Sequence, residues 1–184
     1  VAVHQVLTLI ANDGTEVSGA ATNYAEGAPV TIGGNRYTIF YGEGDGNDVV
    51  LVENATPPAT VYVDDSFTAH GGQAIADADL GSAGDQPAIM SVTAFPTINA
   101  ALAAVADGGT IVVNGGAYAE SVTLAGTRWL RITGPDAAQM VAIDALNAAA
   151  GQGVQIDGAS SLTVSGAAGS LIAGVISGSG SLAK

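Results

Sequence analysis

The apolar positions of the chain follow a helical period just before residue 108 and a period of two after it. The apolar residues that share one helical face, at i, i+3, i+4 and i+7, are Ile98, Ala101, Leu102 and Val105. Pro96 and Thr97 supply a start signal, with Thr97 as the N-cap, and Asp107-Gly108-Gly109 supplies a stop. These positions predict one short helix over residues 96–107.

Short strands are predicted after this helix. Ile111 and Val113 share one face, and Val122 and Leu124 share one after a turn at Gly115-Gly116. Strand candidates then recur at intervals of 19 residues from Ile111 to Leu130, 22 from Ile132 to Val154 and 19 from Ile156 to Val175. A period of about twenty residues with small-residue turns is typical of a solenoid, whose open end a helix can cover.

Residues 1–54 have the pattern of a small antiparallel β module. Its strand candidates are Val6–Ile10, Val30–Ile32, Tyr37–Tyr41 and Asp48–Val52. Gly33-Gly34-Asn35 predicts a tight hairpin, and Pro57-Pro58 predicts a stiff linker over residues 55–59. Residues 65–94 are predicted to form a long loop, which is usually functional or ordered by something bound.

Composition narrows the classes of partner. The chain of 184 residues has 17 acidic and 4 basic residues and a formal net charge of −13, which argues against nucleic acid and anionic membranes. Only 11% of residues are charged, which argues against a disordered acidic tail. The chain has no cysteine and no apolar run of the roughly 20 residues that a membrane span needs, so neither disulfides nor direct membrane insertion is expected. The missing initiator methionine and the strand-like ends lead us to expect a segment of a longer protein.

The stretch from residue 60 resembles right-handed parallel β-helices of the pectin-lyase-like superfamily. The motifs that carry the resemblance are Tyr62-Val63-Asp64, Phe95–Leu102, Gly108–Val113 and Gly116-Ala117-Tyr118-Ala119-Glu120. The resemblance implies an all-β fold: the N-terminal part of a parallel β-helix over residues 60–184, with its capping helix at 96–107, preceded by the antiparallel module at 1–54. The superfamily includes polysaccharide lyases, esterases and non-catalytic surface proteins, so this fold does not give the function.

Two further segments resemble parts of large bacterial surface proteins. Residues Glu26–Leu51, EGAPVTIGGNRYTIFYGEGDGNDVVL, are similar to a module found in repetitive surface proteins. The tail Ile176–Lys184, ISGSGSLAK, looks like the opening of the autotransporter-associated β-strand repeat. These likenesses imply an extracellular or cell-surface location.

Calcium has two candidate sites in the sequence. Residues Gly44–Val50 are one residue short of the calcium-binding nonapeptide, but only one copy is present, so a hairpin turn is the favoured interpretation. Asp77, Asp79 and Asp85 alternate around Gly81, which suits a hard cation, although a solvated acidic loop is the simpler explanation. We therefore expect no cofactor, and we expect any calcium dependence to map to residues 77–85.

Acid–base chemistry has few candidates. Nothing ties His4 or His70 to a nucleophile, and Glu120 and Asp144 are too isolated in the sequence to predict a glycosidase pair. A lyase would need a base, and the basic residues available are Arg36, Arg128, Arg131 and Lys184. Trp129, flanked by Arg128 and Arg131, is either a carbohydrate platform with Arg128 or a packed aromatic, and we favour packing with Arg128 exposed.

The sequence as a whole predicts a non-catalytic structural or adhesin-like segment of an extracellular surface or fibre protein. Its expected partners are neighbouring repeats or copies of the same protein, with surface polysaccharide as a further candidate. The alternative is a carbohydrate-binding or polysaccharide-lyase-type β-helix with a groove formed by Trp129 and the loop around Asp77.

Overall fold

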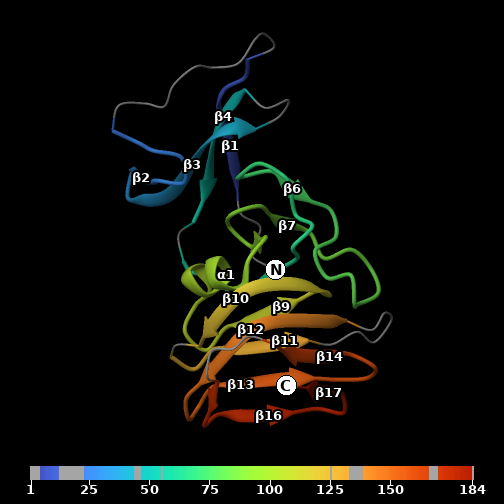
Figure 1. Ribbon diagram of the computed structural model, residues 1–184. Helices are drawn as coiled ribbons and strands as arrows, with labels where there is room; N and C mark the ends of the chain where they lie inside the picture. The colour runs from blue at the N-terminus through green and yellow to red at the C-terminus, as the bar shows by residue number, and fades with distance from the viewer. Residues whose placement is uncertain are drawn as a thin grey trace.

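The chain is mostly β, with one helix, in the residues that the computed structural model describes: 5–12, 23–43, 47–54, 56–124, 126–132, 139–165 and 170–183 (Figure 1). The first strands are β1 Val6–Ile10, β2 Pro29–Ile32, β3 Asn35–Glu43, β4 Asp48–Glu53, β5 Thr60–Val63, β6 Ala74–Ile75, β7 Ala88–Ile89 and β8 Ala94–Phe95. After helix α1, Ile98–Ala104, come β9 Thr110–Val113, β10 Gly116–Thr123, β11 Trp129–Ile132, β12 Met140–Ala148, β13 Gly153–Ile156, β14 Ser161–Val164, β15 Leu171–Ile172, β16 Val175–Ser177 and β17 Ser181–Ala183. The predicted β-rich class is confirmed.

The first four strands form an antiparallel sheet in the order β1-β4-β3-β2. Gly33 and Gly34 make the turn between β2 and β3 with φ of 59° and 86°, a conformation that suits glycine at both central positions of a hairpin. Strands β2 to β4 agree with the candidates read from the alternation of apolar residues. The calcium motif at residues 44–50 lies partly outside the described residues, while Asp48 opens β4 and accepts a hydrogen bond from Asn12 N at 2.8 Å.

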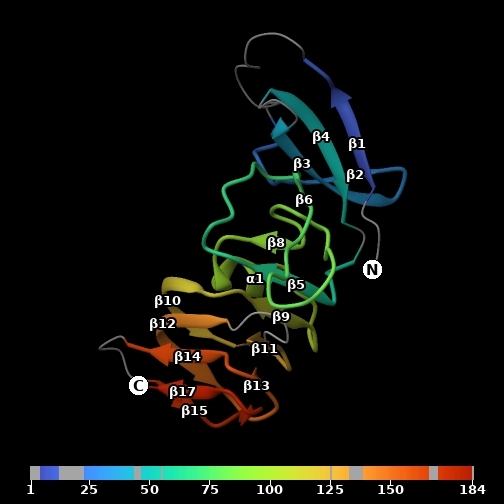
Figure 2. The same cartoon turned by 90° about the vertical axis from the view of Figure 1, so that its right-hand side faces the viewer.

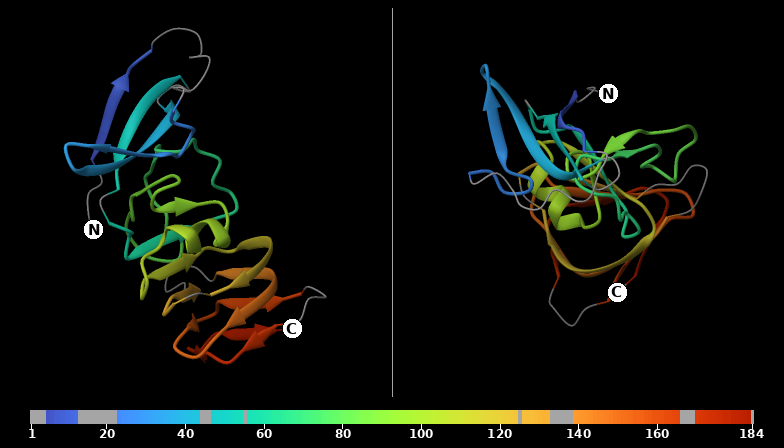
Figure 3. Two further views of the ribbon diagram at one scale, coloured as in Figure 1. Left: turned by 90° about the vertical axis from the view of Figure 1, so that its left-hand side faces the viewer. Right: turned by 90° about the horizontal axis from the view of Figure 1, so that it is seen from above.

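Two parallel sheets make up most of residues 60–183, and we call the strands of these two sheets the parallel stack. One sheet has the order β16-β13-β11-β9-β5-β8, and the other has β10-β12-β14-β17, with β15 also pairing with β12. From β9 to β14 the chain alternates strictly between the two sheets, so each strand pairs in parallel with the strand one pass later (Figure 2). The passes therefore lie one above another along a single axis, as the two views of Figure 3 also show.

Inward-facing aliphatic side chains form one continuous core between these sheets. Leu130 lies in register between Ile111 and Val154, and Ile132 lies opposite Ile156. All five side chains are almost completely buried. Matched residues are separated by 19 positions from Ile111 to Leu130 and by 24 from Leu130 to Val154.

Two of the intervals read from the sequence ran from the end of one strand candidate to the start of the next, so they do not give the register. In the structure Ile132 pairs with Ile156, 24 positions later, and Gly153 pairs with Val175, 22 positions later. A strand with several inward aliphatic residues offers more than one equally apolar partner, and the connections between strands differ in length. The recurrence of apolar residues alone could not choose among these registers.

Helix α1 covers the N-terminal end of the parallel stack, packing against β5, β8, β9 and β10. It is shorter than the predicted 96–107, because Val105 already has an extended backbone with φ −66° and ψ 144°. Thr97 is the N-cap as predicted: its hydroxyl oxygen accepts a hydrogen bond from Ala100 N at 3.3 Å. Ile98, Ala101 and Val105 are buried, whereas Leu102 is only partly buried.

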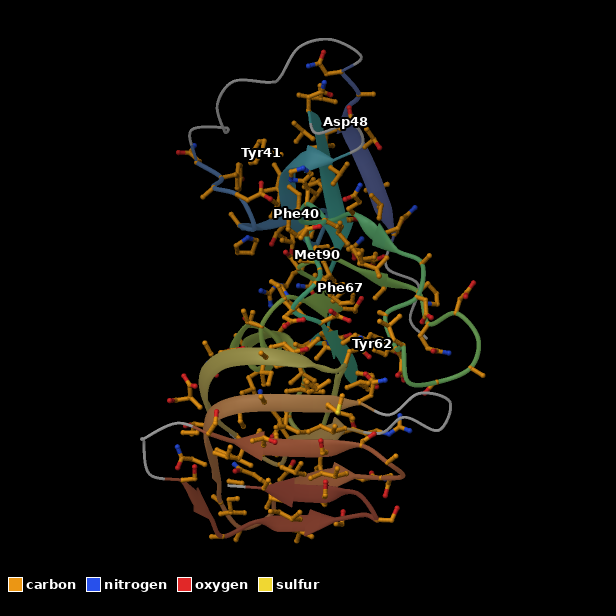
Figure 4. All side chains as sticks on the ribbon, turned by 45° about the vertical axis from the view of Figure 1, so that its right-hand side comes forward. Phe40, Tyr41, Asp48, Tyr62, Phe67 and Met90 are labelled. Atoms are coloured by element: carbon orange, nitrogen blue, oxygen red, sulfur yellow. The ribbon has the colours of Figure 1, made fainter. Side chains whose placement is uncertain are left out.

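The long segment between β5 and β8 joins the parallel stack to the N-terminal sheet. It contains the short antiparallel pair β6–β7, and its Val92 packs with Phe40, Val50 and Val52 from one face of that sheet. Figure 4 places Phe40, Met90, Phe67 and Tyr62 in succession from the sheet toward the stack. The backbone at Gly71 lies so close to the Phe40 ring that a Cβ there would be 2.5 Å from it. An apolar path therefore runs through the predicted loop, which explains why so long a segment is ordered.

Candidate functional site

Most of the polar side chains that the sequence singled out lie at one end of the parallel stack. We call this end the cap: residues 64–97, helix α1, the turn at residues 114–115 between β9 and β10, and the side chains of Glu120 and Arg128, which bind the two ends of α1. Its acidic residues are the candidates for metal binding and catalysis, so the hydrogen bonds of each one decide what the cap can do.

Asp77 and Asp79 use their carboxylates to fold the loop. Asp77 Oδ1 accepts hydrogen bonds from Asp79 N at 3.2 Å and Gln86 N at 3.3 Å. Asp79 is buried and accepts hydrogen bonds from Gly81 N at 3.2 Å and from Ser82 Oγ at 2.9 Å. Such bonds from an aspartate to the backbone two residues on are typical of Asx turns.

The structure does not bring the three calcium candidates together as an ion site. Asp85 is exposed, and within the described part of the chain no group of three or more acidic or histidine side chains is arranged to hold a metal ion. Calcium prefers six to eight oxygen ligands, so Asp77 and Asp79 alone would supply too few. Mapping of any calcium dependence to residues 77–85 stays a prediction.

Asn114 ties the loop to the turn after β9. Its side chain donates to the Ala78 carbonyl oxygen at 3.0 Å and accepts from Leu80 N at 3.2 Å. Asn114 is 1% exposed, so these two bonds satisfy an amide that would otherwise be costly to bury. Sequence reasoning missed this residue because its partners lie more than thirty positions away.

Glu120 caps the N-terminus of α1. Its Oε1 accepts from Ile98 N at 2.8 Å, and its Oε2 accepts from Asn99 N at 2.9 Å. A carboxylate at this place satisfies two backbone donors that have no partner within the helix and complements the positive end of the helix dipole. Asp144 lies on the neighbouring strand β12, opposite a register shift in β10, but both oxygens of Glu120 are already engaged by the helix. The hydrogen bonds of Glu120 therefore hold the N-terminus of α1 against β10.

Asp64, Asp65 and Tyr118 close the junction between β5 and β10. Asp64 Oδ1 accepts from Ser66 N at 2.8 Å, and Asp65 Oδ2 accepts from Ala117 N at 2.9 Å. The buried Tyr118 hydroxyl donates toward the Asn114 carbonyl oxygen at 3.0 Å. Burial raises the pKa of Tyr118, and the nearby charge of Asp64 raises it further, so the phenol stays neutral and can act as a donor.

Arg128 caps the other end of the helix. Its Nε and Nη2 donate to the Val105 carbonyl oxygen at 3.3 Å and 3.1 Å, the place where a cation complements the negative end of the helix dipole. Asp107, in the following turn, accepts from Thr127 N at 2.7 Å, and this bond lowers the pKa of the Asp107 carboxyl. We expected Arg128 to be exposed, with a carbohydrate ligand as the weaker alternative; the structure instead leaves it only partly exposed, because its guanidinium binds the Val105 carbonyl oxygen.

Trp129 packs over a glycine on the next strand. It pairs with Gly153, where a Cβ would lie 2.5 Å from Cζ3 of the indole ring. The missing side chain therefore makes room for the aromatic ring, an arrangement that stabilises glycine within a sheet. Trp129 and Arg131 point outward from the stack and are both partly exposed, since Leu130 between them and Ile132 after them point inward.

Of the two histidines, only His70 lies within the described residues. His70 is exposed, and its backbone N–H donates to Gln73 Oε1 at 3.3 Å. Its ring lies beside Gly42 of the N-terminal sheet. His4 and Lys184 lie outside the described residues.

Comparison with known proteins assigns no family to this chain. A scan of protein-family models and searches of curated proteins and of solved structures find no significant match. Among the described residues, no helix is long and apolar enough to cross a membrane. Any functional assignment must therefore come from the geometry above.

Proposed function

We propose that this chain is a non-catalytic structural segment of an extracellular bacterial surface or fibre protein. In this proposal the parallel stack is the N-terminal part of a right-handed parallel β-helix with α1 as its cap, and the antiparallel sheet is a small module in front of it. The alternation of the chain between two parallel sheets, with matched inward residues on successive passes, supports the β-helix.

The observation that carries the proposal is the use made of the polar side chains in the cap. Glu120 and Arg128 cap the two ends of α1, and Asn114 holds the loop. A catalytic carboxylate or base must be able to reach a substrate proton, whereas these groups are engaged by backbone donors and acceptors. Glu120 also belongs to a motif that carried the resemblance to β-helix proteins, so its place in that motif is explained by its hydrogen bonds to α1 without any substrate.

The surface chemistry agrees with a role outside the cell. A chain with 17 acidic and 4 basic residues keeps copies apart in solution and does not attract nucleic acid. Stability then comes from stacked strands with one continuous aliphatic core, as expected for a cysteine-free chain.

A second candidate function is carbohydrate binding without catalysis. Trp129 and Arg131 share the outward face of β11, and Tyr62 lies on the same sheet two strands away. A flat sheet that presents a partly exposed indole and a cation fits the ring face and hydroxyl groups of a sugar. This arrangement supports a binding face and requires no acid–base pair.

One experiment separates the structural role from the enzyme. The protein is incubated with neutral and acidic polysaccharides, with and without calcium, and the length of the polysaccharide chains is followed by size-exclusion chromatography. We expect no shortening. Shortening that disappears in Glu120→Gln or in Arg131→Ala would overturn the structural proposal, provided that circular dichroism shows the variant to be folded.

Carbohydrate binding is tested with the same polysaccharides. Trp129 is the single tryptophan of the chain, so its emission reports directly on the outward face of β11. A saturable change in emission that is lost in Arg131→Ala would support the binding face. Unchanged emission with every polysaccharide would favour the purely structural role over carbohydrate binding.

A further inference from the structure

The turn between β9 and β10 contains the one Asn-Gly pair of the chain, Asn114-Gly115. An asparagine before glycine deamidates readily in an unfolded chain, because glycine has no Cβ to keep its nitrogen away from the side-chain amide carbon. The Gly115 nitrogen forms a bond to Cγ of Asn114, the bond from Cγ to Nδ2 breaks, and the nitrogen's proton leaves with the amide as ammonia. Water then opens the succinimide ring to an aspartate or an isoaspartate.

The folded turn restrains the attacking peptide group. The Gly115 N–H donates to Gln139 Oε1 at 2.6 Å, which keeps the proton on the nitrogen. The carbonyl oxygen of Asn114, in the same peptide group, accepts from the Tyr118 hydroxyl at 3.0 Å. Closing the ring needs a peptide group that turns freely and gives up its proton, and both hydrogen bonds oppose this.

The side chain of Asn114 is restrained by a loop from the other side of the turn. We call residues 77–86 the acidic loop. Nδ2 of Asn114 donates to the Ala78 carbonyl oxygen at 3.0 Å, and Oδ1 accepts from Leu80 N at 3.2 Å. The side chain is 1% exposed, so the leaving amide group has a partner and no contact with solvent. Deamidation therefore requires the acidic loop to open first.

A carboxylate at position 114 would not let the acidic loop close again. It accepts hydrogen bonds but donates none, so it would face the Ala78 carbonyl oxygen without a proton between them. Asp79 is 4% exposed and lies in the chain between Ala78 and Leu80, so a second negative charge would be buried beside an existing one. The isoaspartate product would also add a methylene group to the backbone of the turn.

We propose that Asn114-Gly115 is a spontaneous modification site that the closed acidic loop protects, and that its deamidation releases this loop irreversibly from the parallel stack. Each opening of the loop exposes the site, so the converted fraction records how often this part of the cap has opened. The inference does not depend on the proposed structural function, and its failure would leave that function untouched.

Peptide mapping by mass spectrometry measures the conversion at position 114. The protein is kept at mildly alkaline pH, where the amide proton is lost faster, both folded and in urea. We expect conversion in urea and conversion that is about tenfold slower or more in the folded chain. Asn99 is the internal control, because it is exposed but followed by Ala100, and it should convert far more slowly than position 114 in urea. Equal rates at position 114 in the folded and unfolded chains would overturn the proposal.

Two variants of Gln139 test the restraint on the Gly115 N–H. Gln139→Ala removes the acceptor, and Gln139→Glu keeps one. Gln139→Ala should speed conversion in the folded chain about fivefold, the factor expected for one lost hydrogen bond, and leave the rate in urea unchanged. Gln139→Glu should restore protection. An unchanged rate in Gln139→Ala, or equal acceleration in both variants, would overturn the protective role of this hydrogen bond.

Hydrogen exchange of peptides from the acidic loop tests the release. Asn114→Asp imitates one product and should speed exchange in residues 77–86 about tenfold or more. Asn35→Asp is the matched control, because it makes the same charge change at an exposed position of the β2–β3 hairpin, and it should leave this exchange unchanged. The same measurement on wild-type protein aged in the folded state does not depend on the folding of Asn114→Asp. Exchange in residues 77–86 that stays slow in the converted chains would overturn the release.

Discussion

Replacing Glu120 tests whether its carboxylate holds the cap on the parallel stack. In the folded chain its two oxygens accept from Ile98 N at 2.8 Å and Asn99 N at 2.9 Å. Glu120→Gln keeps the shape of the side chain but offers one acceptor oxygen and an N–H₂ group, which faces a backbone donor. One of the two hydrogen bonds and the negative charge are lost together.

The expected cost follows from the contributions of these interactions. A hydrogen bond to a charged group contributes about 1.5–3 kcal/mol, and a charge at a helix terminus contributes about 0.3–1 kcal/mol. Glu120 is only partly buried, so values at the lower end of these ranges apply. We expect Glu120→Gln to lower the free energy of unfolding by about 1–2 kcal/mol and Glu120→Ala by about 2–3 kcal/mol.

Urea unfolding followed by Trp129 emission and by circular dichroism measures this loss. Asp85→Asn is the matched control, because it removes one negative charge from an exposed loop position of the cap. Its effect should stay within about 0.5 kcal/mol. Equal free energies of unfolding for Glu120→Gln and Asp85→Asn would refute the capping role. The comparison assumes two-state unfolding, which requires that the transitions followed by the two probes coincide.

Three further substitutions test separate contacts. Tyr118→Phe removes a buried donor and should cost about 1 kcal/mol near neutral pH. Burial raises the Tyr118 pKa above the usual 10.0, so the contribution of Tyr118 to the free energy of unfolding is complete below pH 10. Above pH 10 this contribution falls by about 1.4 kcal/mol per pH unit, as long as the phenol ionises only in the unfolded chain. The stability gap between wild type and Tyr118→Phe should therefore narrow in alkaline urea titrations, and a widening gap would contradict the assigned pKa direction. Gly153→Ala should lower the free energy of unfolding by about 1–3 kcal/mol and change Trp129 emission, because the added Cβ displaces the indole ring. An unchanged emission would argue against the packing of the Trp129 ring over Gly153. Leu102→Asp should lower the free energy of unfolding in urea by about 1–2 kcal/mol, clearly less than Ile98→Asp, because Leu102 is only partly buried and Ile98 is buried. Equal losses in the two variants would contradict the orientation of α1.

The local elements of this fold could be predicted from the sequence because each depends on neighbours a few residues apart. Thr97 and the apolar face of α1 mark the helix, and the glycine pair at residues 33–34 marks the β2–β3 hairpin. The exact register of the parallel strands could not be predicted, because several inward aliphatic residues fit one position equally well. Strand propensity and the period of the apolar residues do not indicate how long each connection between strands is.

The contacts of the cap were beyond sequence reasoning for a different reason. Glu120 meets α1 across 22 positions, and Asp65 meets Ala117 across 52. Such pairs become neighbours only when successive passes of the chain are stacked, and a polar residue in the sequence gives no sign of its partner. The carboxylates of the cap therefore read as metal or catalytic candidates until the register was known.

The acidic character of the chain follows in part from the number of its turns. Short strands leave many backbone N–H groups at their ends, and a carboxylate near a turn can accept from them. The carboxylates that accept hydrogen bonds from backbone N–H groups in the described residues include Glu26, Asp48, Asp64, Asp65, Asp77, Asp79, Asp107, Glu120 and Asp157. Lysine and arginine cannot replace them in this role, because they have no acceptor. A stack of short passes thus gains acidic residues where its backbone donors need partners.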